Sequence, residues 1–296
     1  MSSDGWIKNP HGVKKHLLTI KTKSNIQTIA QIFWGNLENL IKTAQDIQKM
    51  QIFDWIELNI GCPSPKVMKL GWWSALMKDS SKAARIIMQL AKSINLPFSI
   101  KTRTGFNSTT KDQRFDTLVN IAPFVSMITI HWRTYSQWHS GDVDRNFIYS
   151  LKEKVKNKVL IIWNWGITSY DQALSKKENL DWIAIGRGAI GNPWIITPYT
   201  PSPEEKKDTM IEHFYLMLKT QDYFKTTIKS PTDKPFLNPS LKSILHSPIS
   251  HDNKATIEFR KHFMSYIKGH PKASQLRAEI SKIYDYKKLI SFLSSF

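Results

Sequence analysis

Cysteine is almost absent from this sequence, because Cys62 is the only one among 296 residues. A lone cysteine excludes an internal disulfide and leaves no cysteine cluster for zinc. Cys62 is therefore either a buried apolar side chain or a reactive thiol, and the residues around it must decide between the two.

Long apolar segments are absent as well. No run of about 18 uncharged apolar residues occurs, and residues 1–4 lack the basic and apolar regions of a signal peptide. We therefore expect a cytoplasmic protein with no membrane partner.

Acidic residues are scarce relative to basic ones. The chain has 24 Asp and Glu against 42 Lys and Arg, which gives a formal net charge of +18. This balance favours a polyanionic partner, although a lysine-rich genome would produce the same bias. The charge is spread along the chain rather than gathered on one amphipathic helix, which argues against a membrane surface.

Short apolar runs recur along the first two thirds of the chain, and each is followed by a polar or helical stretch. Runs of this length are typical of parallel strands buried on both faces. They lie at 28–33, 55–60, 98–101, 127–131, 160–163 and 182–185. Between them, residues 81–91 predict a helix with Ser81 as its N-cap. Six such units predict an α/β barrel or a doubly wound sheet.

The pattern changes after Trp194, where prolines replace the strand pattern. Helices are predicted at 204–224, 255–267 and 272–284 with no strand between them. We therefore expect a barrel domain over residues 1–200 and a small helical domain over residues 201–296. Basic residues of the second domain lie among aromatic ones, a mixture that suits nucleic-acid backbone contact, although this segment alone favours a solvated helix face with buried aromatics.

Polar side chains follow each predicted strand at the point where it ends. They are Gln31, Asn59 with Cys62, Lys101 with Arg103, His131 with Arg133, Asn164, and Gly186 with Arg187. In parallel barrels the functional groups emerge at the carboxyl ends of strands. Six strands that deliver such side chains to one rim indicate a site.

Residues 58–67 (LNIGCPSPKV) resemble the signature of the tRNA-dihydrouridine synthases, flavin enzymes with a barrel and a helical C-terminal domain. Further segments resemble the same family in the same order: 31–33 (QIF), 101–103 (KTR), 131–134 (HWRT), 164–167 (NWGI), 185–189 (IGRGA), 260–262 (RKH) and 266–269 (YIKG). The resemblance covers about residues 1–285.

The resemblance implies a role for each of these residues. FMN would be bound by Gln31, Lys101, His131, Asn164, Trp165 and Gly166, with Gly186 and Arg187 at its phosphate. Cys62 would be the acid that protonates the uracil ring, and Asn59 and Arg133 would contact the substrate. The tRNA would be bound by Arg260, Lys261, Lys268 and Arg277. NADPH would be the electron source, no metal is implied, and we expect a monomer.

The chain departs from the family at its start. The family's first strand and its flavin-contacting turn have no counterpart, so we interpret the fold as a (β/α)8 barrel that lacks its first one or two strands. A barrel without them exposes unpaired strand edges. We therefore expect these 296 residues alone to bind FMN weakly or to aggregate.

Tryptophan is the second departure. Ten of the 11 tryptophans stand where the family has, or accepts, glycine: Trp6, Trp34, Trp55, Trp72, Trp73, Trp132, Trp138, Trp163, Trp165 and Trp182. Adding ten to the 12 glycines would give about 7% glycine, the usual share. We hypothesise that UGA codons, read as glycine in the source organism, have been translated as tryptophan. A divergent enzyme that truly carries these tryptophans is the alternative.

Two other functions remain open. A barrel flavoprotein acting on a small pyrimidine would share the site, but the charge of +18 gives it no support. A catalytically impaired tRNA-binding homologue would accommodate both departures from the family.

Overall fold

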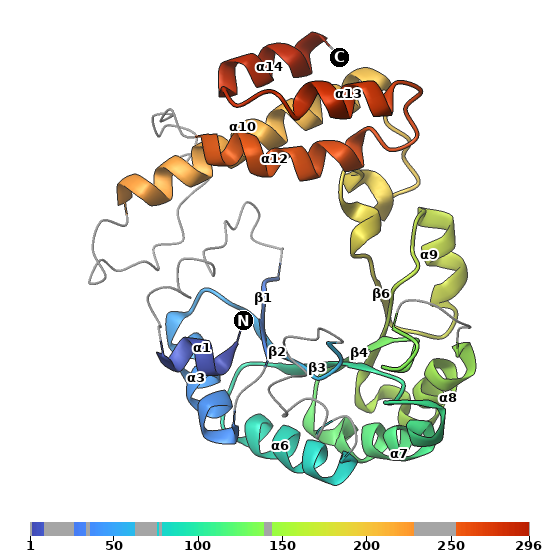
Figure 1. Cartoon of the computed structure of the whole chain (residues 1–296). Helices are drawn as coiled ribbons and strands as arrows, with labels where there is room; N and C mark the ends of the chain where they lie inside the picture. Colours follow the sequence, from blue (N-terminus) through green and yellow to red (C-terminus); the bar gives the residue numbers. More distant parts are fainter. Residues whose placement is uncertain are drawn as a thin grey trace. The chain divides into compact units, whose positions relative to one another are not determined.

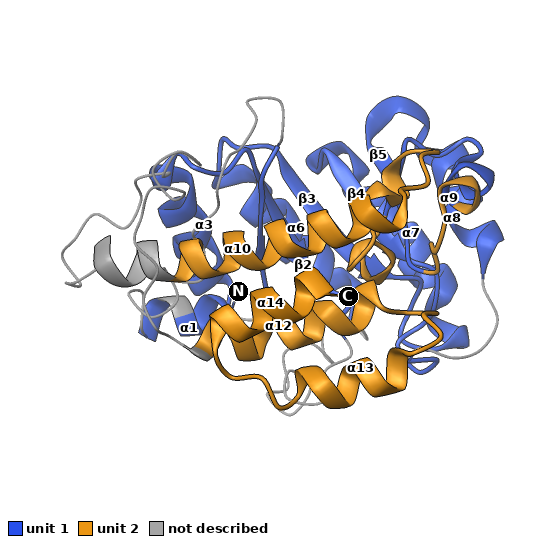
Figure 2. Ribbon diagram, turned by 90° about the horizontal axis from the view of Figure 1, so that it is seen from above, with its two compact units in different colours: residues 1–19, 23–165, 173–184 blue, residues 20–22, 166–172, 185–296 orange. Residues whose placement is uncertain are grey.

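The computed structural model describes residues 2–8, 27–33, 36–62, 76, 79–138, 144–227 and 253–295, except for the side chains of Trp6, of residues 222–227 and of Asn253. The chain divides into two compact units (Figure 2). The sheet unit comprises residues 1–19, 23–165 and 173–184. The helical unit comprises residues 20–22, 166–172 and 185–296.

Within the described residues, six parallel strands form one sheet in the order of the chain, from β1 to β6. They are β1 (Ile29–Ile32), β2 (Trp55–Asn59), β3 (Phe98–Arg103), β4 (Met127–His131), β5 (Leu160–Asn164) and β6 (Trp182–Ala184). All six predicted strands are therefore confirmed. An order that never reverses, with helices on the outer side of a curved sheet (Figure 1), is that of a barrel and not of a doubly wound sheet.

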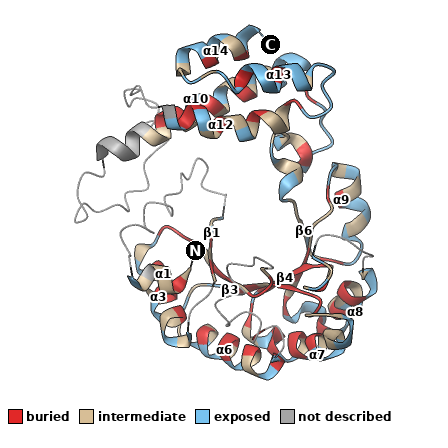
Figure 3. Ribbon diagram, in the orientation of Figure 1, coloured by how far each residue is buried: buried red, intermediate tan, exposed pale blue. Residues whose placement is uncertain are grey.

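Four helices of the sheet unit each bury one stripe of side chains (Figure 3). They are α3 (Leu37–Met50), α6 (Ser80–Lys92), α7 (Lys111–Ile121) and α8 (Arg145–Val155). The unit also contains α1 (Ser3–Lys8), while α9 (Tyr170–Lys177) straddles the two units. In α6 the predicted apolar face is buried. The predicted N-cap is wrong, because Asp79 accepts the N–H of Lys82 and Ser81 lies within the helix. A carboxylate also complements the positive end of the helix dipole.

Short 3₁₀ turns connect several of these elements. They are η1 (Ser108–Thr110), η2 (Ala122–Phe124) and η3 (Lys156–Lys158), followed by η4 (Arg187–Ala189) and η5 (Pro193–Ile196) in the helical unit. Each of the earlier strands is followed by a regular helix, whereas β6 is followed by the turns η4 and η5.

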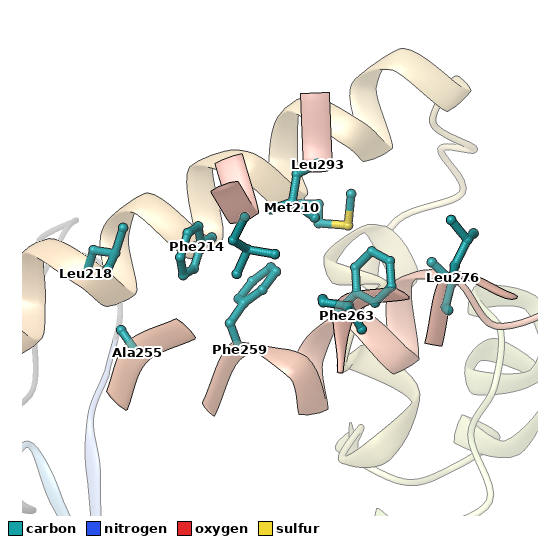
Figure 4. Close-up of a cluster of buried hydrophobic side chains, with 11 residues drawn as sticks. Met210, Phe214, Leu218, Ala255, Phe259, Phe263, Leu276 and Leu293 are labelled. Carbon is teal, nitrogen blue, oxygen red and sulfur yellow. The ribbon is translucent and has the colours of Figure 1, made fainter. Parts of the chain in front are cut away.

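The helical unit is built on α10 (Pro203–Thr227), α12 (Asn253–Tyr266), α13 (Ala273–Ile280) and α14 (Tyr286–Ser295). Figure 4 shows Phe214 and Phe259 facing each other from α10 and α12, and their ring centroids are 4.9 Å apart. The first three helices were predicted, but α13 ends at Ile280 rather than at residue 284, and α14 was not predicted. None of the described helices combines the length and apolar character needed to span a bilayer.

Candidate active site

The two faces of the sheet differ sharply in chemistry. The strand register pairs Gln31 with Glu57, Asn59 with Lys101, and Lys101 with Thr129. It also pairs Arg103 with His131, and His131 with Asn164. Paired residues point to the same face, so all of these side chains share one polar face. The opposite face carries Ile32, Ile56, Leu58, Ile100, Ile128, Ile130 and Ile161, all buried. The sequence therefore brings five of its predicted site residues, Gln31, Asn59, Lys101, His131 and Asn164, onto one surface.

A chain of hydrogen bonds crosses the first two strands of this face. The Gln31 amide donates from Nε2 to Glu57 Oε1 at 2.6 Å and accepts at Oε1 from Asn59 Nδ2 at 3.0 Å. Asn59 Oδ1 in turn accepts the backbone N–H of Gly61 at 3.0 Å. Both amides thus have one fixed orientation.

Lys101 is the cation of this face. Burial lowers the pKa of its ammonium, and the charge of Glu57 partly opposes that shift. Within the described residues, the ammonium makes no hydrogen bond or ion pair. A buried cation in this state suits a ligand that carries or develops negative charge.

Arg103 organises the loop that carries the cysteine. The side chain is 2% exposed, its Nε donates to the carbonyl of Gly61 at 3.1 Å, and its Nη1 donates to the carbonyls of Thr134 and Trp138 at 2.9 and 2.8 Å. Burial lowers the pKa of the guanidinium to about 10. Gly61 has no room for a side chain, because a Cβ there would lie 2.9 Å from the backbone of Thr102. Cys62 follows this anchored residue and is half-buried. The rest of its motif, residues 63–67, lies outside the described residues.

His131 and Trp165 lie against each other at the end of the polar face, with ring centroids 4.8 Å apart. Trp165 has φ 97°, a conformation that side chains rarely adopt, and Gly166 follows with φ 72°. The indole thus occupies space beside a predicted flavin contact. Two consecutive positive φ values are typical of a turn built for glycine.

The other tryptophans divide into two groups. Trp138 also has a positive φ, 50°, and the buried indole N–H of Trp132 has no hydrogen-bond partner among the described residues. Trp163, in contrast, is fully buried on the apolar face, and its Nε1 donates to the carbonyl of Trp165 at 2.9 Å. Trp34, Trp72 and Trp73 lie outside the described residues. Glycine fits the geometry at 165 and 138, whereas a tryptophan side chain is well packed at 163.

The predicted phosphate loop belongs to the helical unit. Gly186 and Arg187 are exposed, and Gly191, with φ 74°, packs so tightly that a Cβ would lie 2.6 Å from the backbone of Ser265 and of Tyr266. This contact holds the loop against the end of α12. Between them lies a cavity of about 540 Å³ lined by three cations, Arg187, Lys206 and Lys268.

The predicted tRNA-binding residues are used in different ways. Lys261, Lys268 and Arg277 are exposed. Arg260 instead donates from Nη2 to the carbonyl of Ile283 at 2.6 Å, and its guanidinium lies 4.6 Å from the ring centre of Tyr284. Arg260 therefore joins α12 to the segment before α14.

Arg133, a predicted substrate contact, stacks its guanidinium over the ring of Trp132, 4.8 Å from the ring centre.

Glu57 is a charged side chain of the polar face that sequence reasoning did not single out. A charged residue in the middle of a buried strand is the signal that could have found it, because such a residue is rarely buried without a partner. Among the described residues, no cluster of three His, Cys, Asp or Glu side chains is arranged to hold a metal ion.

Residues 8–295 match a family model described as "Dihydrouridine synthase (Dus)". A probable tRNA-dihydrouridine synthase of Rickettsia conorii is 38% identical over 191 residues, which are 60% of this chain and 56% of that protein. A probable tRNA-dihydrouridine synthase of Rickettsia typhi is 28% identical over 243 residues, 78% of this chain and 65% of that protein. The tRNA-dihydrouridine synthase B of Pasteurella multocida is 32% identical over 176 residues, 53% of this chain and 51% of that protein. The chain thus spans about half to two thirds of the length of these relatives.

Proposed function

Because the chain belongs to the dihydrouridine synthase family, we propose that it catalyses the FMN-dependent reduction of uridine to 5,6-dihydrouridine in tRNA. The polar face of the sheet is the observation that carries this proposal. Four of the predicted flavin contacts, Gln31, Lys101, His131 and Asn164, share that face at the carboxyl ends of their strands. The loop that carries Cys62 begins beside them, directly after β2.

The donor set of this face fits a flavin. Gln31 and Asn164 offer amide groups, His131 a ring nitrogen, and Lys101 a buried cation that stabilises the negative charge of a reduced isoalloxazine. Trp165 and Gly166 form the turn beside them, and Gly186 and Arg187 offer an exposed glycine and a guanidinium to the phosphate. A bound flavin, reduced by NADPH, would supply the hydride to carbon 6 of uracil.

Cys62 and Asn59 complete the reaction on the substrate. The thiol of Cys62 can give its proton to carbon 5 while hydride arrives at carbon 6. Both new C–H bonds form at the expense of the carbon–carbon double bond, and the thiolate then takes a proton from water. Asn59, locked by Gln31 and Gly61, keeps one donor and one acceptor site for the edge of the base. Arg133 is the remaining predicted substrate contact.

The target base must leave its stack to reach this face, so the RNA around it has to be held separately. The cavity of the helical unit supports this role. Two of its cations, Lys206 and Lys268, suit RNA phosphates, since the third, Arg187, is assigned to the FMN phosphate. Tyr199 and Tyr266 line the same cavity and offer rings on which an unstacked base can lie. We assign tRNA backbone binding to this cavity and to the exposed Lys261 and Arg277.

Mass-spectrometric detection of dihydrouridine tests the proposed function. tRNA from cells that lack their own synthases is analysed after expression of the protein or of Cys62→Ala. We expect dihydrouridine only with the unchanged protein, because loss of a general acid costs on the order of 10²- to 10⁴-fold in rate. Flavin content and melting temperature of the variant serve as controls. Equal dihydrouridine levels would refute the role of Cys62, and none in either sample would refute the reaction.

Trp165 favours a second candidate function, a tRNA-binding protein without catalysis. Its indole occupies space beside His131, where the flavin would bind. Flavin absorbance that copurifies with the protein would exclude this candidate. Measurement of tRNA binding distinguishes these two candidates from an oxidoreductase of small pyrimidines. Salt-sensitive tRNA binding would argue against the small-pyrimidine enzyme, because such an enzyme does not need to bind RNA.

A further inference from the structure

We propose that Glu57 is a positioning residue: its carboxylate fixes the Gln31 amide, and through it Asn59, in the orientation that receives the cofactor and the base. The inference rests on the proposed flavin function and adds a residue to it. Glu57 lies in the middle of β2, two residues before Asn59, and its side chain is 7% exposed.

A carboxylate at this position is costly for the fold. Burial raises its pKa, and only the hydrogen bond from Gln31, the charge of Lys101 and the contact with Thr129 oppose that shift. A well-packed apolar side chain often serves stability as well as, or better than, a buried charge. The geometry around Glu57 therefore points to a task other than stability.

The hydrogen bonds define that task. A carboxylate only accepts hydrogen bonds, so Glu57 Oε1 forces the NH₂ group of Gln31 toward itself at 2.6 Å. The carbonyl end of Gln31 must then face Asn59, whose Nδ2 donates to it at 3.0 Å. Asn59 is left with Oδ1 toward the Gly61 N–H, at 3.0 Å. One acceptor thus sets the direction of two amides in series.

The second oxygen of Glu57 faces two further residues of the same face. Thr129 Oγ1 lies 3.5 Å from Oε2, at the limit of a hydrogen bond. The Lys101 ammonium interacts with the carboxylate through charge alone, since no hydrogen bond or ion pair joins them within the described residues. Glu57 therefore balances the charge of Lys101, and the three N–H donors of the Lys101 ammonium are left for a ligand.

Substitution Glu57→Gln tests the proposal, because it keeps the shape and replaces one acceptor by a donor. Ser99→Ala is the matched control: Ser99 is the register partner of Glu57 and is fully buried, but its Oγ contacts only the carbonyl of Ile56, at 3.4 Å, and not the Gln31 network. Each protein is titrated with FMN, and melting temperature, kcat and KM for tRNA are measured separately. We expect Glu57→Gln to weaken FMN binding and lower kcat by on the order of tenfold to a hundredfold, with an unchanged melting temperature of the flavin-free protein. Ser99→Ala should match the unchanged protein.

Two more variants keep the test decisive if Glu57→Gln folds poorly. Glu57→Asp retains the carboxylate and should recover most of the FMN affinity. In the Gln31→Leu background, Glu57→Gln should cause little further loss, because both residues act through one amide. A lower melting temperature with unchanged FMN affinity would reduce Glu57 to a structural role, and equal behaviour of Glu57→Gln and Ser99→Ala would also overturn the proposal. Absence of FMN binding by the unchanged protein, even at FMN concentrations high enough to reveal the weak binding expected above, would instead refute the flavin function on which the proposal rests.

Discussion

The polar face of the sheet and the centre of the helical unit are both buried, but they are built from opposite chemistry. The sheet buries Glu57 and Arg103, which are 7% and 2% exposed, and largely buries Lys101 with them. The helical unit buries a cluster of apolar side chains, with Phe214, Phe259 and Phe263 at its centre (Figure 4).

The difference suggests that the polar face of the sheet serves function, whereas the apolar cluster of the helical unit serves stability. Buried charges cost free energy, so their gathering on one face of the sheet supports a ligand site there. The aromatic cluster of the helical unit supplies stability and leaves that unit's basic residues to its surface, where Lys261, Lys268 and Arg277 are exposed. Substitutions in the two regions should therefore have different consequences.

Phe259→Ala should have the largest effect on stability. Loss of a fully buried ring typically costs about 3–5 kcal/mol, enough to unfold the helical unit. Calorimetry should show a lower transition temperature for the helical unit, and tRNA binding should be lost. FMN binding should weaken but persist, because the predicted phosphate loop belongs to the helical unit whereas the predicted ring contacts belong to the sheet unit. Ile257→Ala on the same helix is the control, since Ile257 is 44% exposed and should change stability by less than about 0.5 kcal/mol. Joint loss of FMN binding would show that the two regions do not act separately.

Trp165→Gly should have a smaller effect of the opposite sign. Relief of a φ of 97° contributes about 1–3 kcal/mol, part of which is offset by the lost contact with His131. We expect a net gain of roughly 1 kcal/mol and tighter FMN binding, measured by chemical denaturation and FMN titration. Trp163→Gly is the matched contrast, because this fully buried indole should cost at least about 3 kcal/mol. A UGG codon at 165 would remove that position from the glycine hypothesis, and weaker FMN binding by Trp165→Gly would contradict the steric argument.

The sequence predicted the strands and the residues at their ends, because buried parallel strands are nearly continuous apolar runs. The partners of those residues depend on contacts between distant segments. Glu57 acquires its role from its register with Gln31, 26 positions earlier, and Arg103 from carbonyls 42, 31 and 35 positions away. A pattern of neighbouring residues in the sequence cannot reveal contacts over such separations.

Local patterns also failed where two signals competed. Ser81 is a common N-cap residue, yet Asp79 caps α6 two positions earlier. In contrast, α14 was predictable in principle, because Leu289 and Leu293 are buried at a spacing of one helical turn. The tryptophans show most clearly how far sequence reasoning reaches. Composition does not distinguish Trp163 from Trp165, whereas the structure gives Trp163 a fully buried side chain and Trp165 a backbone conformation typical of glycine.

The smallest expected effect concerns the cavity of the helical unit. Replacing Lys206 and Lys268 by Ala should leave stability within about 0.5 kcal/mol, because both side chains are exposed. If each neutralises one phosphate, the slope of log K against log salt for tRNA should fall by roughly 1.4 to 1.8, while FMN affinity stays unchanged. Lys287→Ala with Lys288→Ala is the control, since these exposed lysines of α14 do not line the cavity. Equal slopes for the two double variants would show that the charge of the whole unit, and not its cavity, holds the RNA.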